Sequence, residues 1–236
     1  MQLPDSESAK NKLEHFATDT NVGMKIAGIL FVFGGLLFIL LSTASESLYP
    51  SFSLLDNSFS DMAAVGTRTF PVEETAVFGV AITWIAGAYF LYRGTGRKIF
   101  SIFNAIAGTG SLLAGLSPEN LNLTIHSVGA LLLFPFGAAA VFLSYRVIHS
   151  SFRYFSIGLG SLTAAATLVT FFGENIVGPC GNCVGKTPGY VQSLTQLGLG
   201  LGGWEAMIIF PLLIWLIGFG SYLMATSSST RRTGQT

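Results

Sequence analysis

Six stretches of this chain contain no Asp, Glu, Lys or Arg, and their apolar residues do not alternate strictly with polar ones. Each is close to the roughly 20 apolar residues that an α-helix needs to cross the hydrocarbon core of a bilayer. Backbone groups in lipid must be hydrogen-bonded within the protein, and barrel strands would alternate in polarity, so the pattern favours helices. The sequence therefore predicts an all-α polytopic membrane protein, a bundle of six transmembrane helices. The stretches are residues 26–43, 75–92, 99–116, 124–144, 154–172 and 206–225.

The polar segments around these stretches divide the chain into three regions. Residues 1–22 are predicted to be a cytoplasmic segment, either an amphipathic helix or a frayed tail. Residues 23–225 form the transmembrane domain, and residues 226–236 a disordered cytoplasmic tail rich in Ser and Thr. Two connections are long, residues 44–74 and 173–205, and function is expected there. The first apolar stretch could instead belong to a signal peptide, but its leader and its apolar core are both long for one.

The composition agrees with a lipid environment, because 50% of the 236 residues are hydrophobic and only 10% are charged. The formal net charge of +0 conceals a separation of charges. All Lys and Arg residues except Arg68 and Lys186 fall in the termini or in the connections on their side of the membrane. Basic loops stay cytoplasmic, which predicts a multi-pass protein of the plasma membrane with both termini inside. The expected partners are membrane lipids and other membrane subunits, and no compact basic and aromatic patch indicates nucleic acid.

One polar segment in the first long connection has the pattern of an ordered element. Residues 49–62 alternate apolar side chains with hydroxyl, amide and carboxylate groups. We expect a short interfacial helix that Asn57 or Ser58 caps, with Asp61 near the helix bundle. Asn57 and Ser60 are candidate ligand-binding residues, and Asp61 is a candidate catalytic residue. The alternative is a docked loop with a structural role only.

The third-to-fourth connection places a carboxylate close to the single histidine of the apolar stretches. Glu119 precedes His126 by seven residues, which is two helical turns if the helix begins that early. A histidine just inside a membrane is costly when charged and needs a partner, here Glu119 or Asp61. Such a pair could shuttle protons, bind a metal or join two helices, so Glu119 and His126 are candidate catalytic residues. No cofactor is expected, and a metal held by His126 and carboxylates is the alternative.

The second long connection carries two more candidate features. Glu205 follows a Gly-rich run, residues 197–203, at the start of the sixth stretch. The helix dipole favours a carboxylate there without any function, and Glu205 is also a candidate ligand-binding residue. Cys180 and Cys183 are the only two cysteines, and on the oxidising side of a plasma membrane they predict a loop-closing disulfide. A redox pair or a zinc site would need a fold or further ligands that this connection does not supply.

Several short motifs occur together in a characteristic order. They are Tyr49-Pro50, Asn57-Ser58-Phe59-Ser60-Asp61, Pro118-Glu119 with His126 after it, and Gly203-Trp204-Glu205 followed by Pro211 and Trp215. In these motifs the chain resembles the six-span membrane proteins of domain-of-unknown-function family 998, common in archaea and bacteria, from about residue 23 to residue 224. The resemblance implies a six-helix fold and a membrane location but no established activity. That family commonly places Arg after the glutamate, where this chain has Ala206, so Glu205 must have another partner or the family's site is missing.

These features leave three functional hypotheses, and enzymatic activity stays undecided. The leading one is a polar site near the outer leaflet for a lipid-like or hydrophobic ligand. An intramembrane hydrolase or transferase would use Asp61, Glu119 and His126 as acid, base or metal ligands on a lipid. A structural or assembly subunit would use the same residues as a network. A transporter is less favoured, because the inner halves of the stretches offer little beyond Ser, Thr and Asn104, and no internal repeat is present.

Overall fold

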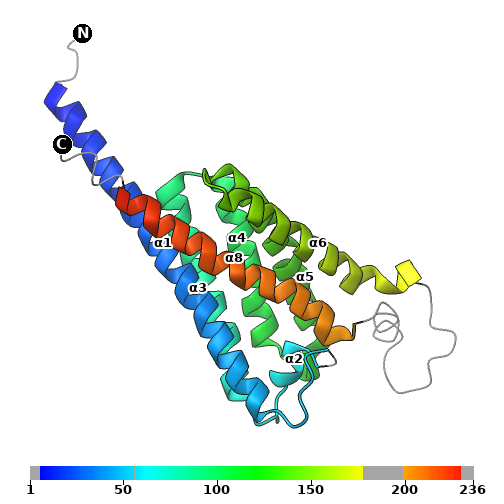
Figure 1. The fold of residues 1–236 in the computed structure, drawn as a ribbon. Coiled ribbons are helices and arrows are strands. Elements are labelled where there is room, and N and C mark those ends of the chain that lie inside the picture. Colours follow the sequence, from blue (N-terminus) through cyan, green and yellow to red (C-terminus); the bar gives the residue numbers. More distant parts are fainter. Residues whose placement is uncertain (1–5, 56, 178–198, 230–236) are drawn as a thin grey trace.

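The computed structural model is a bundle of long helices, and it describes residues 6–55, 57–177 and 199–229 (Figure 1). Within these ranges there is no strand, and six helices are long and apolar enough to cross a membrane, which confirms the predicted fold class. The helices are α1 (Ser6–Leu48), α2 (Phe59–Met62), α3 (Phe70–Thr95), α4 (Lys98–Leu116), α5 (Glu119–Leu143), a short 3₁₀ helix (Ser144–Arg146), α6 (Phe152–Val177) and α8 (Leu201–Ser229).

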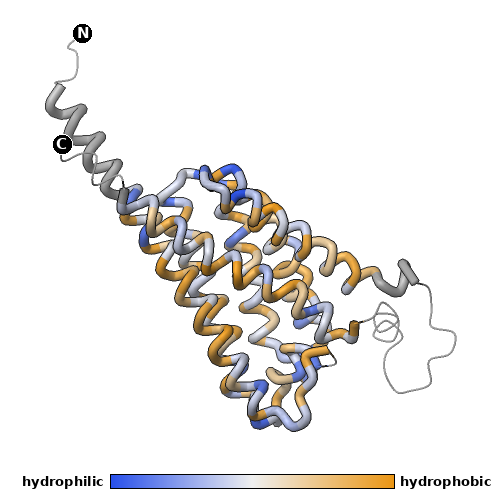
Figure 2. Tube along the Cα trace, viewed as in Figure 1, coloured by the Kyte–Doolittle hydropathy of each residue, from blue (hydrophilic) through white to orange (hydrophobic). Residues whose placement is uncertain are grey.

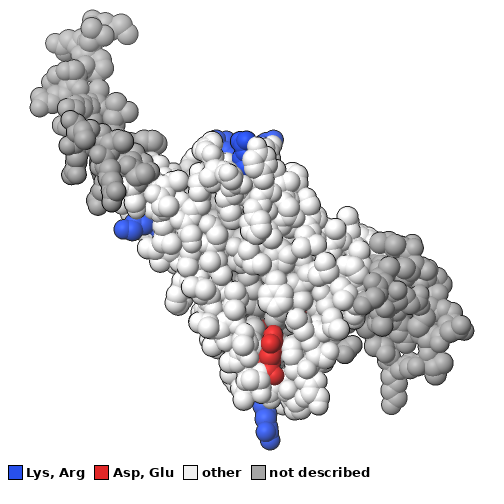
Figure 3. Space-filling model, in the orientation of Figure 1, with Lys and Arg blue, Asp and Glu red and all other residues white. Residues whose placement is uncertain are grey.

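The two ends of the bundle differ in charge. The start of α1 and the end of α8 lie at one end, which we call the termini end, and α2 lies at the other, which we call the α2 end (Figure 1). Hydrophobic residues predominate along the helices between these ends (Figure 2). Charged atoms gather at the ends of the face drawn in Figure 3. Of the Lys and Arg side chains that the structure describes, only Arg68 lies at the α2 end.

Several helices extend beyond the apolar stretches that predict them. The helix α3 begins at Phe70, with Pro71 in its first turn, so Glu73 and Glu74 are part of the helix and not of the preceding loop. At the other end of α3, Gly96 adopts a left-handed φ of 65° and its N–H closes the last turn, which explains a glycine there. The helix α8 continues to Ser229, into the tail that the sequence predicts to be disordered.

Glycines let two pairs of helices approach closely. A Cβ atom on Gly129 of α5 would lie 2.5 Å from the backbone nitrogen of Ala114 and 2.8 Å from the carbonyl oxygen of Gly110, both in α4. A Cβ atom on Gly28 of α1 would lie 2.5 Å from the carbonyl oxygen of Gly220 in α8. Real Cβ atoms do not approach backbone so closely, so any larger residue would force these helices apart.

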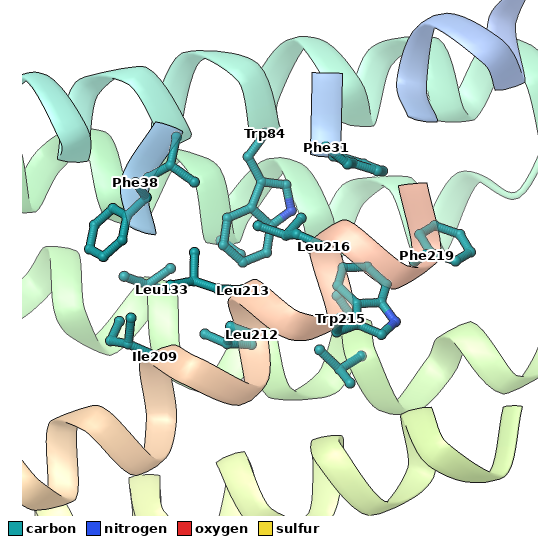
Figure 4. Close-up of a cluster of buried hydrophobic side chains, with 14 of the residues drawn as sticks. Phe31, Phe38, Trp84, Leu133, Ile209, Leu212, Leu213, Trp215, Leu216 and Phe219 are labelled. Atoms are coloured by element: carbon teal, nitrogen blue, oxygen red, sulfur yellow. The ribbon is translucent and has the colours of Figure 1, made fainter. Parts of the chain in front are cut away.

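Aromatic side chains fill the core on the side of the termini end. Trp215 and Phe219 of α8 are fully buried and stack with ring centroids 4.9 Å apart and an interplanar angle of 10°. Phe31 of α1 packs beside both rings, with centroid distances of 6.3 and 6.1 Å (Figure 4). Burial of such rings is a large stabilising contribution in a protein core.

The indole N–H groups of this core are paired with neutral partners on other elements. Trp84 of α3 donates to the amide oxygen of Asn104 in α4 at 2.9 Å. Trp215 donates to the hydroxyl of Ser144 at 3.1 Å. The amide group of Asn104 and the hydroxyl of Ser144 donate in turn to backbone carbonyls of their own segments. These groups are satisfied without any charge, as buried polar groups in lipid should be.

Candidate functional site

A reciprocal capping arrangement holds the short helix α2. Ser58 Oγ accepts the N–H of Asp61 at 3.1 Å, and the Asp61 carboxylate accepts the N–H of Ser58 at 2.8 Å. A short capped helix is therefore confirmed, with Ser58 as the cap. Asn57 instead accepts the N–H of Ser53 at 3.0 Å. Asp61 and Asn57 thus bond to the backbone of their own segment, and neither lines the cavity described below.

Glu205 follows the first turn of α8, which begins at Leu201, and connects that helix to the start of α2. Its Oε2 atom accepts the N–H of Phe59, the first residue of α2, at 2.7 Å. That N–H has no partner within its own helix, which is why a carboxylate is favoured beside it. The glycines before Glu205 permit the contact, because a Cβ atom on Gly202 would collide with the backbone of Asn57. The backbone of α2 is therefore the partner of Glu205, in the absence of an adjacent arginine.

Hydroxyl groups link α2 to the start of α5. Ser60 Oγ donates to Glu119 Oε2 at 2.9 Å and lies 2.8 Å from Ser58 Oγ. Because the single proton of Ser60 is given to Glu119, Ser58 is the donor in the contact between the two serines. Burial raises the pKa of the nearby Tyr49 above its ordinary 10.0, and the charges of Asp61 and Glu119 raise it further. Tyr49 therefore stays a neutral phenol beside these acids.

His126 bonds to the backbone of α4 and not to a carboxylate. Its Nδ1 atom lies 3.2 Å from the carbonyl oxygen of Ala114 and 3.2 Å from that of Ser117. Two acceptors require Nδ1 to carry the proton, which in a neutral ring leaves Nε2 as an acceptor. The direct pairing with Glu119 or Asp61 that the sequence predicts is not among the hydrogen bonds of the described residues.

The helical spacing that predicts this pairing is interrupted. The helix α5 leaves helical conformation at Asn122, where φ is −152° and ψ is 88°. Glu119 and His126 are therefore not two regular turns apart on one helix face. Both nevertheless line the same cavity, because the chain turns between them.

A cavity of about 410 Å³ lies at the α2 end, lined by residues of α2 and of all six long helices. Its lining is mixed, with carboxylate, hydroxyl and imidazole groups beside a larger number of apolar side chains. The polar lining residues are Ser58, Ser60, Glu74, Ser111, Glu119, His126, Ser127, Thr170 and Glu205. The apolar lining residues include Phe38, Val77, Leu133, Phe134, Phe171 and Ile209. Glu119, His126, Ser60 and Glu205 are thus brought together, although they come from three distant parts of the chain.

Two buried carboxylates at this end were not among the predicted site residues. Glu73 is 0% exposed and accepts the hydroxyl of Ser42 at 2.8 Å, and Glu74 is 8% exposed and lines the cavity. Within the described part of the chain, one carboxylate oxygen of each, Oε2, is buried without a hydrogen-bond partner. The signal that finds them is Pro71 followed by two acids, which is typical of a helix start.

Two further predictions have different outcomes. Cys180 and Cys183, predicted to form a disulfide, lie outside the described residues. In the ranges that the structure covers, no three His, Cys, Asp or Glu side chains converge as a metal site would require. The described geometry therefore offers no support for a metal on His126 and the carboxylates, and leaves the carboxylates and Nε2 as groups that can accept protons or hydrogen bonds.

The fold and the site together define a class: a polytopic membrane protein of six spanning helices, with carboxylates around a cavity near one end of the bundle. The chain belongs to the DUF998 family, described as protein of unknown function, because the model of that family matches residues 32–222. This match confirms the resemblance seen in the motifs and includes every residue that lines the cavity. No curated protein and no solved structure matches the chain.

Proposed function

We propose that the protein binds a lipid-like or hydrophobic ligand in the cavity at the α2 end, with the polar group of the ligand among Glu74, Glu119 and Glu205. The mixed lining of the cavity carries this proposal. Small-molecule sites usually have volumes of roughly 300–1,000 Å³, apolar walls and a few convergent polar groups. This cavity, at about 410 Å³, has that size and that kind of lining.

A carboxyl group that lines a cavity and lacks a full set of protein partners favours a binding site over a purely structural network. Acidic groups inside a membrane are costly, and those that only join helices are expected to be fully paired. Within the described ranges, Glu74 lines the cavity with one buried oxygen that has no protein partner. A ligand that fills the cavity would give the carboxyl group of Glu74 a polar neighbour, whereas a fully paired network would need none.

In this proposal the α2 end faces the outside of the plasma membrane. This orientation follows from the Lys and Arg residues. Those that the structure describes lie mostly at the termini end, and basic loops stay cytoplasmic. A membrane-impermeant thiol reagent on intact cells would then label V65C and spare S150C, each in a chain whose native cysteines are replaced by serine. Labelling of S150C alone would reverse the orientation.

A cavity-filling substitution tests the binding proposal. In A130F a large ring enters the cavity, while the matched control A165F adds the same ring to an exposed position on α6. Organic extracts of the purified proteins would be analysed by mass spectrometry. We expect an amphiphile in stoichiometric amount from the wild type and from A165F, and at least tenfold less from A130F. An equal yield from A130F, or no amphiphile from any of the three, would overturn the proposal.

A hydrolase or transferase acting on the same ligand is the second candidate function. The hydrogen bond from Ser60 to Glu119 favours it, because a carboxylate that accepts a serine proton can act as its base. The Nε2 lone pair of His126 on the same cavity could accept a second proton. Under this hypothesis S60A would retain the amphiphile and stop its conversion. A wild-type protein that holds its extracted ligand chemically unchanged would exclude the enzyme.

A further inference from the structure

The charged lining of the cavity has a single sign. Glu74 comes from α3, Glu119 from α5 and Glu205 from α8, and all three line the cavity. The described lining contains no Lys and no Arg. Charges that are withdrawn from water need a partner of opposite sign. Among the described residues that line the cavity, no Lys or Arg supplies that partner.

The carboxylate oxygens at the cavity are hydrogen-bond acceptors. Glu74 is 8% exposed, and its Oε2 atom is buried with no partner among the described residues. The hydrogen bonds from Ser60 to Glu119 and from Phe59 to Glu205 both reach the Oε2 atom of the carboxylate. In a neutral His126 ring whose Nδ1 carries the proton, Nε2 is an acceptor as well. The proton of Ser60 is already donated to Glu119.

The space for Glu74 is created by a glycine in the neighbouring helix. A Cβ atom on Gly115 of α4 would lie 3.1 Å from Glu74 Oε1 and 3.0 Å from the side chain of Val77. The carboxylate therefore occupies a fitted position against α4 and does not lie loosely in a wide opening. Figure 3 shows acidic atoms at one place on the face drawn, with basic atoms at either end of that face.

Resting on the proposed binding function, we infer that the ligand is an amphiphile with a protonated primary amine as its polar group, bound beside the carboxylates of the cavity that Glu74, Glu119 and Glu205 line. A primary ammonium carries one positive charge and three N–H donors, which matches a cluster of acceptors of negative sign. The alkyl part lies against the apolar lining, which includes Phe38, Leu133 and Ile209. A phosphate or carboxylate head group would place like charges together, and a neutral alcohol would donate a hydrogen bond without offsetting charge.

Three probes with the same alkyl chain test this inference on the full-length protein in phosphatidylcholine nanodiscs. They are hexadecylamine, hexadecanol and hexadecyl phosphate, and binding is measured by native mass spectrometry with empty nanodiscs as the background. We expect hexadecylamine to bind saturably, one molecule per chain, at least tenfold more tightly than the other two. E74Q should weaken amine binding by at least tenfold, whereas E46Q, at an acid of α1 that does not line the cavity, should leave it unchanged.

The outcomes separate the head-group inference from the binding function on which it rests. Equal binding of hexadecanol, or preferential binding of hexadecyl phosphate, would overturn the amine and leave a hydrophobic ligand site in place. Failure of all three probes to bind would overturn both. Wild-type amine binding in E74Q would also refute the assigned contact, and E119Q provides the same test if E74Q does not fold. Weakening by E46Q equal to that by E74Q would show attraction by surface charge only.

Discussion

The two halves of the bundle treat their buried polar groups differently. Towards the termini end, the groups that bond between elements are neutral, as in the indole of Trp84 on Asn104 and that of Trp215 on Ser144, and the groups buried there without a described partner are the neutral hydroxyls of Ser101 and Ser156. Towards the α2 end they are carboxylates around a cavity, and Glu74 keeps a buried oxygen with no described partner. The first arrangement contributes to the stability of the fold. The second leaves acidic groups at a cavity without a full set of hydrogen-bond partners, which is typical of a binding site.

The largest expected effect comes from breaking the aromatic core. W215A removes a fully buried ring that stacks on Phe219, so we expect it to lower the free energy of unfolding by about 3–5 kcal/mol. The neighbouring I214A is the control, because Ile214 is 46% exposed on the outside of the bundle and should cost less than about 1 kcal/mol. Denaturant titration in detergent micelles measures both. Similar losses in the two variants would contradict the assigned core.

A medium effect is expected from the neutral hydrogen bond between α3 and α4. N104L removes the acceptor of the Trp84 N–H and leaves that donor buried, which should cost about 1–3 kcal/mol. T109V is the control on the same helix, because Thr109 is exposed and bonds only to its own helix at Ala105. The same titration applies. If N104L were as stable as T109V, the termini half would not depend on paired polar groups.

The smallest expected effect has the opposite sign and lies in the α2 half. In ligand-free protein near neutral pH, E74Q replaces a buried carboxylate that lacks a described partner by a neutral amide, so the free energy of unfolding should rise by about 1 kcal/mol. E46Q, at a half-buried acid away from the cavity, should leave stability unchanged. A loss of stability in E74Q would make Glu74 a structural group and would remove the contrast between the halves.

Much of the fold could be predicted from the sequence, because the length of an uncharged apolar stretch is a local property. The capped segment could also be predicted, since a serine three residues before an acid is a local signal. The sequence makes Glu119, His126 and Glu205 candidates because an ionisable side chain at the edge of a membrane helix is energetically costly unless it has a partner or a function. All three line the cavity.

The rest of the site could not be found from apolar stretches alone. Glu73 and Glu74 fall just outside the second stretch, so they resemble loop acids until the start of α3 at Phe70 is known. The partners of His126 depend on where α4 ends and on the break at Asn122, and neither has a simple sequence signal. The Oδ2 atom of Asp61 caps the backbone of its own segment, and Asp61 is not among the residues that line the cavity.

By itself the sequence determined how many helices cross the membrane, because transfer of an apolar segment into hydrocarbon depends on that segment alone. Only the tertiary structure decided that Glu74, Glu119 and Glu205 line one cavity, since their positions depend on how three helices rotate and pack around it. The bond from Phe59 to Glu205 joins residues 146 positions apart, and no spacing rule reaches that far. The physical reason is that the free energy of moving an apolar segment into the membrane depends on the residues of that segment, whereas the pairing of polar groups depends on which helices pack against one another.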